Sequence, residues 1–187
     1  MPPRTAAIQN AAIQSAVTLP AEFYRRPADI VARELLGKYL VRRIGDETVA
    51  LQIHETEAYV GAHDLACHGR FGCTDRTAVM FGPAGYWYTY LIYGMHWMLN
   101  VVTGEVDQPA AVLFRGAGNS RGPGKLCREL SIDKSHYGLP ATAKSGLWIE
   151  DRGYTIRRGG ILRTPRIGID YAGAWKDKKL RYVLKDS

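Results

Sequence analysis

Residues 39–59 read YLVRRIGDETVALQIHETEAY and contain two runs rich in β-branched, aromatic and other apolar residues, separated by a Gly-Asp pair at 45–46. Two such runs on either side of a glycine-containing turn are typical of a β-hairpin. We therefore expect strands over residues 39–44 and 48–59. Alternate residues of a strand share a face. One face of the second strand is predicted to carry Val49, Leu51, Ile53, Glu55, Glu57 and Tyr59.

A second hairpin is predicted from YWYTYLIY, residues 86–93, which is followed by Gly94 and by WMLNVV, residues 97–102. Strand alternation divides the first run into two sets of side chains. One face is expected to carry Tyr86, Tyr88, Tyr90 and Ile92. The other is expected to carry Trp87, Thr89, Leu91 and Tyr93.

The remaining segments predict short elements. Pro27 and the apolar spacing up to Leu36 indicate a helix that ends at Gly37. Further strands are expected over residues 110–115, 147–150, 164–169 and 181–184, and a short helix over 123–130. Most connections are too short for parallel crossovers. The pattern predicts an α+β fold with a curved, mainly antiparallel sheet and flanking helices.

The length of 187 residues fits one domain. Residues 1–20 are rich in Ala, Gln, Thr and Ser and are expected to form a mobile tail or at most one short helix, which leaves residues 21–187 as the single domain. This segment lacks the continuous apolar run of a secretory signal.

The composition favours a soluble globular protein over a disordered one, because 46% of residues are apolar and 23% are charged. No stretch approaches the roughly 20 consecutive apolar residues of a membrane span. Twenty-five Lys and Arg against 18 Asp and Glu give a net charge of +7, which points to a polyanionic partner. Three cysteines are too few, and an odd number, for a disulfide framework and fit a reducing compartment.

Glu57 is a candidate general base, because a carboxylate at the end of an apolar strand face would be held away from bulk water. The alternative is an ordinary solvent-facing acid at a strand end. Zinc-type ligands occur at His63, Cys67, His68 and Cys73, but they lack the paired spacing of CxxC or HExxH.

Two further features leave alternatives open. RGPGK, residues 121–125, is too short for a nucleotide-binding loop; it suits a DNA phosphate at a helix start, or is a simply capped helix. The tyrosine cluster is either core or the flat wall that an enzyme needs to hold a nucleobase extracted from a duplex.

Four motifs occur in order along the chain: HETEAYVG at 54–61, ACHGR at 66–70, YWYTYLIYGMHWMLN at 86–100 and RGPGKLCRELSIDK at 121–134. Together they resemble the 3-methyladenine (alkyladenine) DNA glycosylase family, collinearly from about Phe23 to Val183. The resemblance implies a monofunctional enzyme of base excision repair. It would flip an alkylated or deaminated purine, such as 3-methyladenine, hypoxanthine or ethenoadenine, from duplex DNA and hydrolyse the N-glycosidic bond.

The resemblance also implies roles for individual residues. Glu57 would activate the attacking water, and Arg115 would lie beside the water. The flipped base would be held by Tyr59, His68 and Tyr90, and Asn100 would disfavour the exocyclic amine of guanine. Tyr93 would fill the vacated space in the duplex, from the opposite strand face to Tyr90.

No metal or cofactor is implied, and the His/Cys loop is then a pocket wall. Contacts with the DNA backbone are expected from Arg70, Arg76, Arg121 and Lys125, with Arg115 also available. The expected partner is double-stranded DNA with a damaged purine, bound by a monomer in the cytoplasm or nucleoid of a bacterium or the nucleus of a eukaryote. Two rivals remain: a module that binds distorted DNA without cutting, and a metal-dependent hydrolase using Glu55, Glu57, His63 and His68.

Overall fold

The computed structural model describes residues 16–185. The fold is organised by its longest strand, β3 (Glu47–Tyr59), which pairs with three other strands. The first half of β3 pairs with β2 (Tyr39–Ile44), and the second half pairs with β6 (Ala110–Ala117). Residues 55–57 also pair with β10 (Arg181–Leu184). Every strand pair within the described residues is antiparallel, as the short connections predict.

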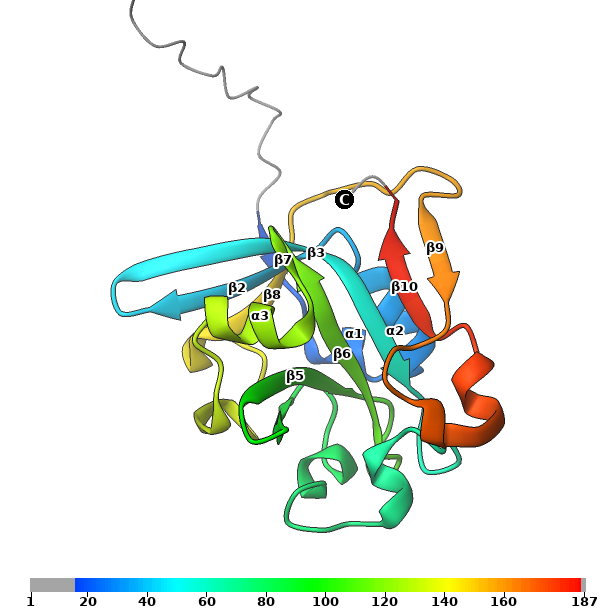
Figure 1. Ribbon diagram of the computed structural model, residues 1–187. Coiled ribbons are helices and arrows are strands. Elements are labelled where there is room, and N and C mark those ends of the chain that lie inside the picture. The colour runs from blue at the N-terminus through cyan, green and yellow to red at the C-terminus, as the bar shows by residue number, and fades with distance from the viewer. Residues whose placement is uncertain (1–15, 186–187) are drawn as a thin grey trace, which may run out of the picture.

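The sheet has the order β1-β8-β2-β3-β6-β5-β4 within residues 16–185, with β7 beside β6, and β9 beside β10 (Figure 1). The other strands are β1 (Val17–Thr18), β4 (Trp87–Ile92), β5 (His96–Thr103), β7 (Ser120–Arg121), β8 (Leu147–Asp151) and β9 (Ile161–Thr164). The α-helices are α1 (Ala21–Tyr24), α2 (Ala28–Leu35) and α3 (Pro123–Glu129). Short 3₁₀ helices are η1 (His68–Phe71), η2 (Ala78–Phe81), η3 (Lys134–His136), η4 (Ala143–Ser145) and the kinked η5 (Asp170–Asp177).

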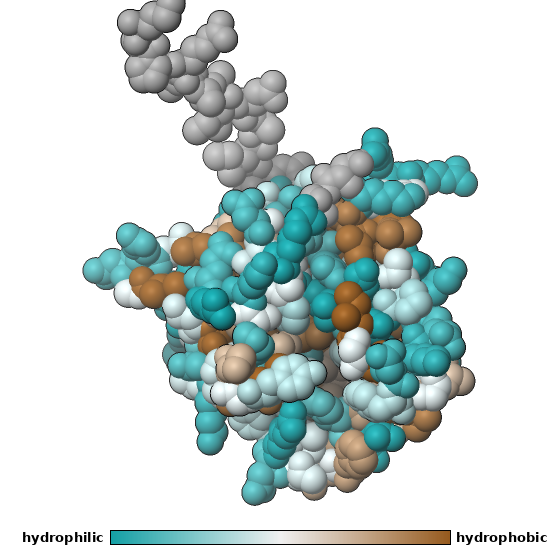
Figure 2. Space-filling view, in the orientation of Figure 1, coloured by the Kyte–Doolittle hydropathy of each residue, from teal (hydrophilic) through white to brown (hydrophobic). Residues whose placement is uncertain are grey.

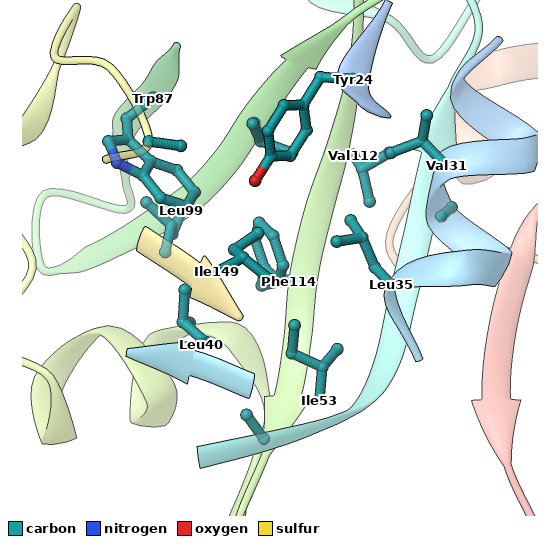
Figure 3. Close-up of a cluster of buried hydrophobic side chains, with 14 of the residues drawn as sticks. Tyr24, Val31, Leu35, Leu40, Ile53, Trp87, Leu99, Val112, Phe114 and Ile149 are labelled. Atoms are coloured by element: carbon teal, nitrogen blue, oxygen red, sulfur yellow. The ribbon is translucent and has the colours of Figure 1, made fainter. Parts of the chain in front are cut away.

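The main core cluster packs α2 against the sheet and also includes Leu126 and Cys127 of α3. Helix α2 packs on β3 and β6 from behind in the view of Figure 1, whereas α3 packs on β5 and β6 nearer the viewer. Val31 and Leu35 of α2 point toward Ile53, Val112 and Phe114 of the two strands (Figure 3). All five side chains are buried, each contributing about 1.5–3 kcal/mol of hydrophobic stabilisation. None of the helices in the described part of the chain is long and apolar enough to cross a membrane.

The pairing of β3 with β6 is interrupted by two adjacent bulges. Ile53 lies opposite Ala117, but Glu55 lies opposite Gly116 and Thr56 opposite Phe114. Each strand therefore accommodates one extra residue, His54 on β3 and Arg115 on β6. An extra residue on a strand exchanges its two faces from that point onward.

The prediction that one face of β3 carries both its apolar residues and its carboxylates is therefore wrong. Ile53 and Ala58 both belong to the main core cluster although they are five residues apart, which strict alternation does not allow. Thr56 also faces the core and donates a hydrogen bond to the backbone carbonyl of Ala32 in α2 at 2.8 Å. Glu55, Glu57 and Tyr59 share a face, as predicted, but it is the face opposite the core.

Most predicted elements are confirmed, including both hairpins, the strand over 110–115, the strands near 147–150 and 181–184, and the helices near 27–36 and 123–130. The strand predicted over residues 164–169 is wrong: β9 ends at Thr164, and 165–169 form a loop. Pro165 has no N–H to donate to a strand partner, and Gly168 has φ +76°. Part of the predicted tail, Val17–Thr18, pairs with β8, while residues 1–15 lie outside the described residues.

The bulge places Gly116 against His54, so we expect a side chain at position 116 to lower the stability of the fold. A Cβ added to Gly116 would lie 2.2 Å from Cε1 of buried His54. We expect Gly116→Ala to lower the free energy of unfolding by about 1–3 kcal/mol, because the ring must shift in a packed site. Urea denaturation measures this cost, and in a His54→Ala background it should shrink. An equal cost in both backgrounds would show that the two residues do not conflict.

Candidate active site

A cavity of about 450 Å³ opens on the face of the sheet that carries Glu55 and Tyr59. Its wall combines aromatic side chains from four parts of the chain. They are Tyr59 from β3, His68 from η1, Tyr88 and Tyr90 from β4, and Tyr171 from η5. The cavity is thus lined by flat rings, which suit a planar aromatic ligand. On the face shown in Figure 2, hydrophilic residues surround apolar residues near the middle.

The β4–β5 hairpin builds one wall through strand alternation. Tyr88, Tyr90 and Ile92 line the cavity, as the predicted shared face requires, while Trp87 on the other face is fully buried in the core. Asn100 of β5 lies opposite Tyr88 and is buried. Its side-chain amide donates a hydrogen bond to the carbonyl of Tyr88 at 3.1 Å, which fixes its orientation in the cavity wall.

His68 is held against this wall by close packing and by a hydrogen bond. A Cβ on Gly69 would lie 2.3 Å from Cβ of Pro109, so only glycine lets η1 approach the 104–109 loop so closely. The His68 Nδ1 lies 2.8 Å from the hydroxyl of Tyr88, and its ring packs edge-on against Tyr90 at 4.7 Å. Burial, helped by the charge of Arg76, lowers the pKa of His68 to about 4. The imidazole is therefore neutral near pH 7.

Glu57 lies directly behind this cavity and is 0% exposed. Its Oε2 accepts a hydrogen bond from the Tyr59 hydroxyl at 2.9 Å, and its Oε1 accepts one from the backbone N–H of Ile167 at 2.9 Å. The Nε of Arg115 lies 3.4 Å from the same Oε1. Tyr59, Arg115 and Ile167 all line the cavity, so the residues that contact the carboxylate also form part of the cavity wall.

Burial raises the pKa of Glu57 above its ordinary value, and the net effect persists although several groups oppose it. Those groups are the charge of Arg115, the Ile167 N–H, the Tyr59 hydroxyl and the charge of Arg166. The pKa of Tyr59 is raised well above its usual range, chiefly by burial and then by the neighbouring carboxylate. Tyr59 therefore remains a hydrogen-bond donor to Glu57, and a carboxylate of raised pKa is suited to accept a proton near neutral pH.

Arg115 is shared between two carboxylates. Its Nε donates to Oε1 of Glu55 at 3.0 Å while lying near Glu57. Arg181 of β10 also donates to the same Glu55 oxygen at 3.0 Å. Glu55 thus shares the Nε of Arg115 with Glu57 and is itself paired with two arginines.

Tyr93 is predicted to lie on the strand face opposite Tyr90, and this placement is wrong. Strand β4 ends at Ile92, and Tyr93 occupies the hairpin loop with φ +53°, a left-handed conformation that costs a bulky residue about 1–2 kcal/mol. Its side chain is 83% exposed and contributes to the rim of the cavity. Strand alternation does not apply to a residue outside the ladder.

The predicted backbone-binding residues divide into two groups. Arg76 lines the cavity and places its guanidinium 5.1 Å from the ring centre of Tyr90, so it belongs to the pocket wall. Arg70, Arg121 and Lys125 are exposed and do not line the cavity.

The zinc-type residues of the sequence have other neighbours. His63 packs edge-on against Trp175, Cys67 donates to the carbonyl of Pro109, and His68 contacts Tyr88. Cys73 is exposed. Among residues 16–185 no three His, Cys, Asp or Glu side chains are grouped so that they could hold a metal ion.

Four residues that contribute to the site are not predicted from the sequence. Tyr88 carries a signal, because it shares the predicted face of Tyr90. Ile167 acts through its backbone N–H, which leaves no trace in the side-chain pattern. Arg166 and Asp64 form a buried ion pair beside Tyr59, and only the folded chain brings these distant residues together.

An aromatic cavity with a buried carboxylate behind its wall, on a basic protein, is the arrangement expected of a hydrolase that acts on a flat, base-sized group. The comparisons with known proteins agree with this class. The family model described as methylpurine-DNA glycosylase (MPG) matches residues 22–120 and 117–187. The chain belongs to the methylpurine-DNA glycosylase family. It is therefore a DNA glycosylase of DNA repair, a hydrolase of N-glycosyl bonds that processes alkylated bases.

Relatives match along almost the whole chain. A protein of Myxococcus xanthus (strain DK1622) is 45% identical over 178 residues, covering 90% of this chain and 91% of its own length. One from Legionella pneumophila (strain Lens) is 44% identical over 176 residues, with coverages of 90% and 95%. One from Methanocella arvoryzae is 44% identical over 190 residues, with coverages of 90% and 93%. Each is named "Putative 3-methyladenine DNA glycosylase".

The buried carboxylate predicts a pH-dependent stability difference. Because the pKa of Glu57 is higher in the folded than in the unfolded chain, the unfolded state loses its proton first as the pH rises. The wild type should therefore lose stability relative to Glu57→Gln as the pH rises from the unfolded pKa to the folded pKa. Gln cannot accept hydrogen bonds at both positions, but this cost does not vary with pH. Urea denaturation from pH 4 to pH 9 tests it; a difference constant with pH would contradict the burial argument.

Proposed function

We propose that this enzyme excises alkylated or deaminated purines, such as 3-methyladenine, hypoxanthine and ethenoadenine, from double-stranded DNA. The purine is flipped into the aromatic cavity, and a water activated by Glu57 hydrolyses its N-glycosidic bond. The observation that carries the proposal is the position of the Glu57 carboxylate, which is buried and accepts hydrogen bonds from Tyr59 and Ile167, two residues that line the aromatic cavity. No lysine nucleophile is needed, since the reaction is a direct hydrolysis.

In this reaction the flipped base is held between the rings of Tyr59, His68 and Tyr90. The neutral state of His68 supports this role, because an uncharged ring can pack against a cationic or neutral purine without repulsion. Asn100 is held rigidly by Tyr88 and would leave the exocyclic amine of guanine unaccommodated, which is specificity by exclusion.

The chemical step uses the negative charge of Glu57 twice. The carboxylate accepts a proton from the water that attacks C1′, and it stabilises the positive charge that develops on the sugar. The electron pair of the breaking N-glycosidic bond leaves with the purine. A cationic or protonated purine is a good leaving group for this step. Arg115 and the Ile167 N–H orient the carboxylate from the opposite side to Tyr59.

The rim of the cavity faces the duplex. Tyr93 is the proposed wedge that occupies the space of the flipped base, and its exposed ring at a hairpin tip supports that role. Exposed Arg70, Arg121 and Lys125 are proposed to contact phosphates, and Arg76 to contribute charge at the pocket wall. The resemblance argues for a monomer acting on DNA in the cytoplasm, the nucleoid or the nucleus.

The proposed base predicts that Glu57→Gln reduces base release by about a hundredfold or more while leaving DNA binding largely intact. The assay measures free purine from duplex oligonucleotides carrying 3-methyladenine, 7-methylguanine, hypoxanthine or ethenoadenine, at enzyme excess and with EDTA present. Glu34→Gln, which removes an exposed carboxylate paired with Arg26, is the matched control and should release base normally.

Three outcomes would count against the assignment. Near-normal release by Glu57→Gln would exclude Glu57 as the base. Loss of wild-type release in EDTA would favour the metal-dependent hydrolase. Tight binding without any release by the wild type would favour the non-cutting binder.

Because Tyr93 has a strained backbone conformation and is the proposed wedge, we expect Tyr93→Gly to lower activity without lowering stability. Glycine tolerates φ +53°, so we expect the free energy of unfolding to stay the same or rise by up to about 1 kcal/mol. Base release and binding to lesion-containing duplex should nevertheless fall. Tyr154→Ala removes another exposed ring and serves as the control. Normal release by Tyr93→Gly would refute the wedge.

A further inference from the structure

A buried ion pair joins two loops beside the candidate active site. The Nη1 of Arg166 donates to Oδ2 of Asp64 at 2.6 Å, and its Nη2 donates to Oδ1 at 2.8 Å. Both side chains are 0% exposed. Asp64 also accepts hydrogen bonds from the backbone N–H groups of Val60 and Ala66, so the carboxylate is fully engaged. The pair ties the segment after β3 to the loop after β9.

The guanidinium of Arg166 also supports Tyr59. It lies 4.7 Å from the centre of the Tyr59 ring, and its Nη1 donates to the carbonyl of Ala58 at 2.8 Å. One side chain thus fixes the backbone before Tyr59 and contacts the ring itself. The ring position determines where the Tyr59 hydroxyl meets Glu57.

The neighbour of Arg166 in the chain supplies the second contact with Glu57. The backbone N–H of Ile167 donates to Oε1 of Glu57, and it belongs to a loop without strand pairing. Nothing in the ladder fixes that N–H, since β9 ends at Thr164. One residue away, the bidentate ion pair between Arg166 and Asp64 holds this loop in place.

We propose that the Asp64–Arg166 pair positions both the Tyr59 hydroxyl and the Ile167 N–H on the carboxylate of Glu57. Arg166 and Asp64 are positioning residues, because neither lines the cavity. The inference rests on the proposed role of Glu57 as the base. It assigns the orientation of that base to a pair more than 100 residues apart in sequence.

The charge of Arg166 has a second effect on the same carboxylate. The ionisable groups that act on Glu57 are Tyr59 on β3, Tyr90 on β4, Arg115 on β6 and Arg166. Arg166 and Arg115 lower the pKa of Glu57, and burial raises it. Loss of the Arg166 charge should therefore raise the pKa of Glu57 further, whereas Arg166→Lys, which keeps the charge, should leave this effect in place.

The test compares two substitutions by single-turnover release of hypoxanthine from a duplex between pH 5 and pH 9. Arg166→Gln should move the acid limb of the rate profile to higher pH. Arg166→Lys keeps the charge but cannot form the bidentate fork, so its acid limb should stay while its plateau rate falls by about tenfold or more. Arg152→Gln, which breaks the exposed pair with Glu150, should change neither quantity.

A second measurement reports the hydrogen bond from Ile167 to Glu57 and does not depend on an activity assay. The amide proton of Ile167, which donates to a carboxylate, should resonate downfield in the wild type and shift upfield in Arg166→Lys and in the nearly isosteric Asp64→Asn. Thermal unfolding identifies which variants are folded. If an Arg166 variant does not fold, Asp64→Asn is used in its place for the Ile167 amide measurement.

The outcomes separate this inference from the proposed function. A folded Arg166→Gln with the wild-type acid limb would overturn the electrostatic effect of Arg166 on Glu57, and a folded Arg166→Lys with the wild-type plateau and Ile167 amide shift would overturn the positioning role. Absence of base release by the wild type from every lesion would instead overturn the proposed function. In that case the amide shift would still decide whether the pair orients Glu57.

Discussion

The paired bulges between β3 and β6 are the constraint on which the site depends. Because each strand takes up one extra residue, the side of β3 that faces the core before His54 faces the cavity after it. Ile53 can therefore pack under α2 while Glu57, four residues later on the same strand, lies on the other side of the sheet. The same event on β6 leaves Phe114 in the core and turns Arg115 toward the carboxylates. Without the bulges, strict alternation would place the carboxylates on the same face of β3 as Ile53, which packs in the core.

The sequence predicts what depends on local pattern and misses what depends on an inserted residue or a main-chain contact. Alternation in YWYTYLIY correctly groups Tyr88 and Tyr90 on one face, because no irregularity interrupts β4. Alternation fails across His54, since a bulge changes the faces without changing the composition of the strand. It fails again at Tyr93, which has left the ladder. The contribution of Ile167 comes from a backbone N–H, and the ion pair of Asp64 with Arg166 requires two loops that only the tertiary fold brings together.

The electrostatics of the site are arranged in layers. Glu57 is buried deeply enough to raise its pKa, but it is contacted by a hydroxyl, an amide and a guanidinium that keep the charged form accessible. Behind these, Glu55 and Asp64 hold the two arginines, so that neither cation is free to neutralise Glu57 completely. A buried carboxylate in such a setting destabilises the fold and suits proton transfer, and this trade between stability and activity is a general property of active sites.

The hydrogen bond from Ile167 to Glu57 has a consequence for how the rim of the pocket can vary. The donor is a main-chain atom, while the side chain of Ile167 is 51% exposed at the cavity mouth. Substitution of that side chain can alter what the mouth admits without removing the donor that orients the carboxylate. A change of side chain at position 167 therefore alters the surface of the cavity mouth and leaves the main-chain hydrogen bond to Glu57 in place.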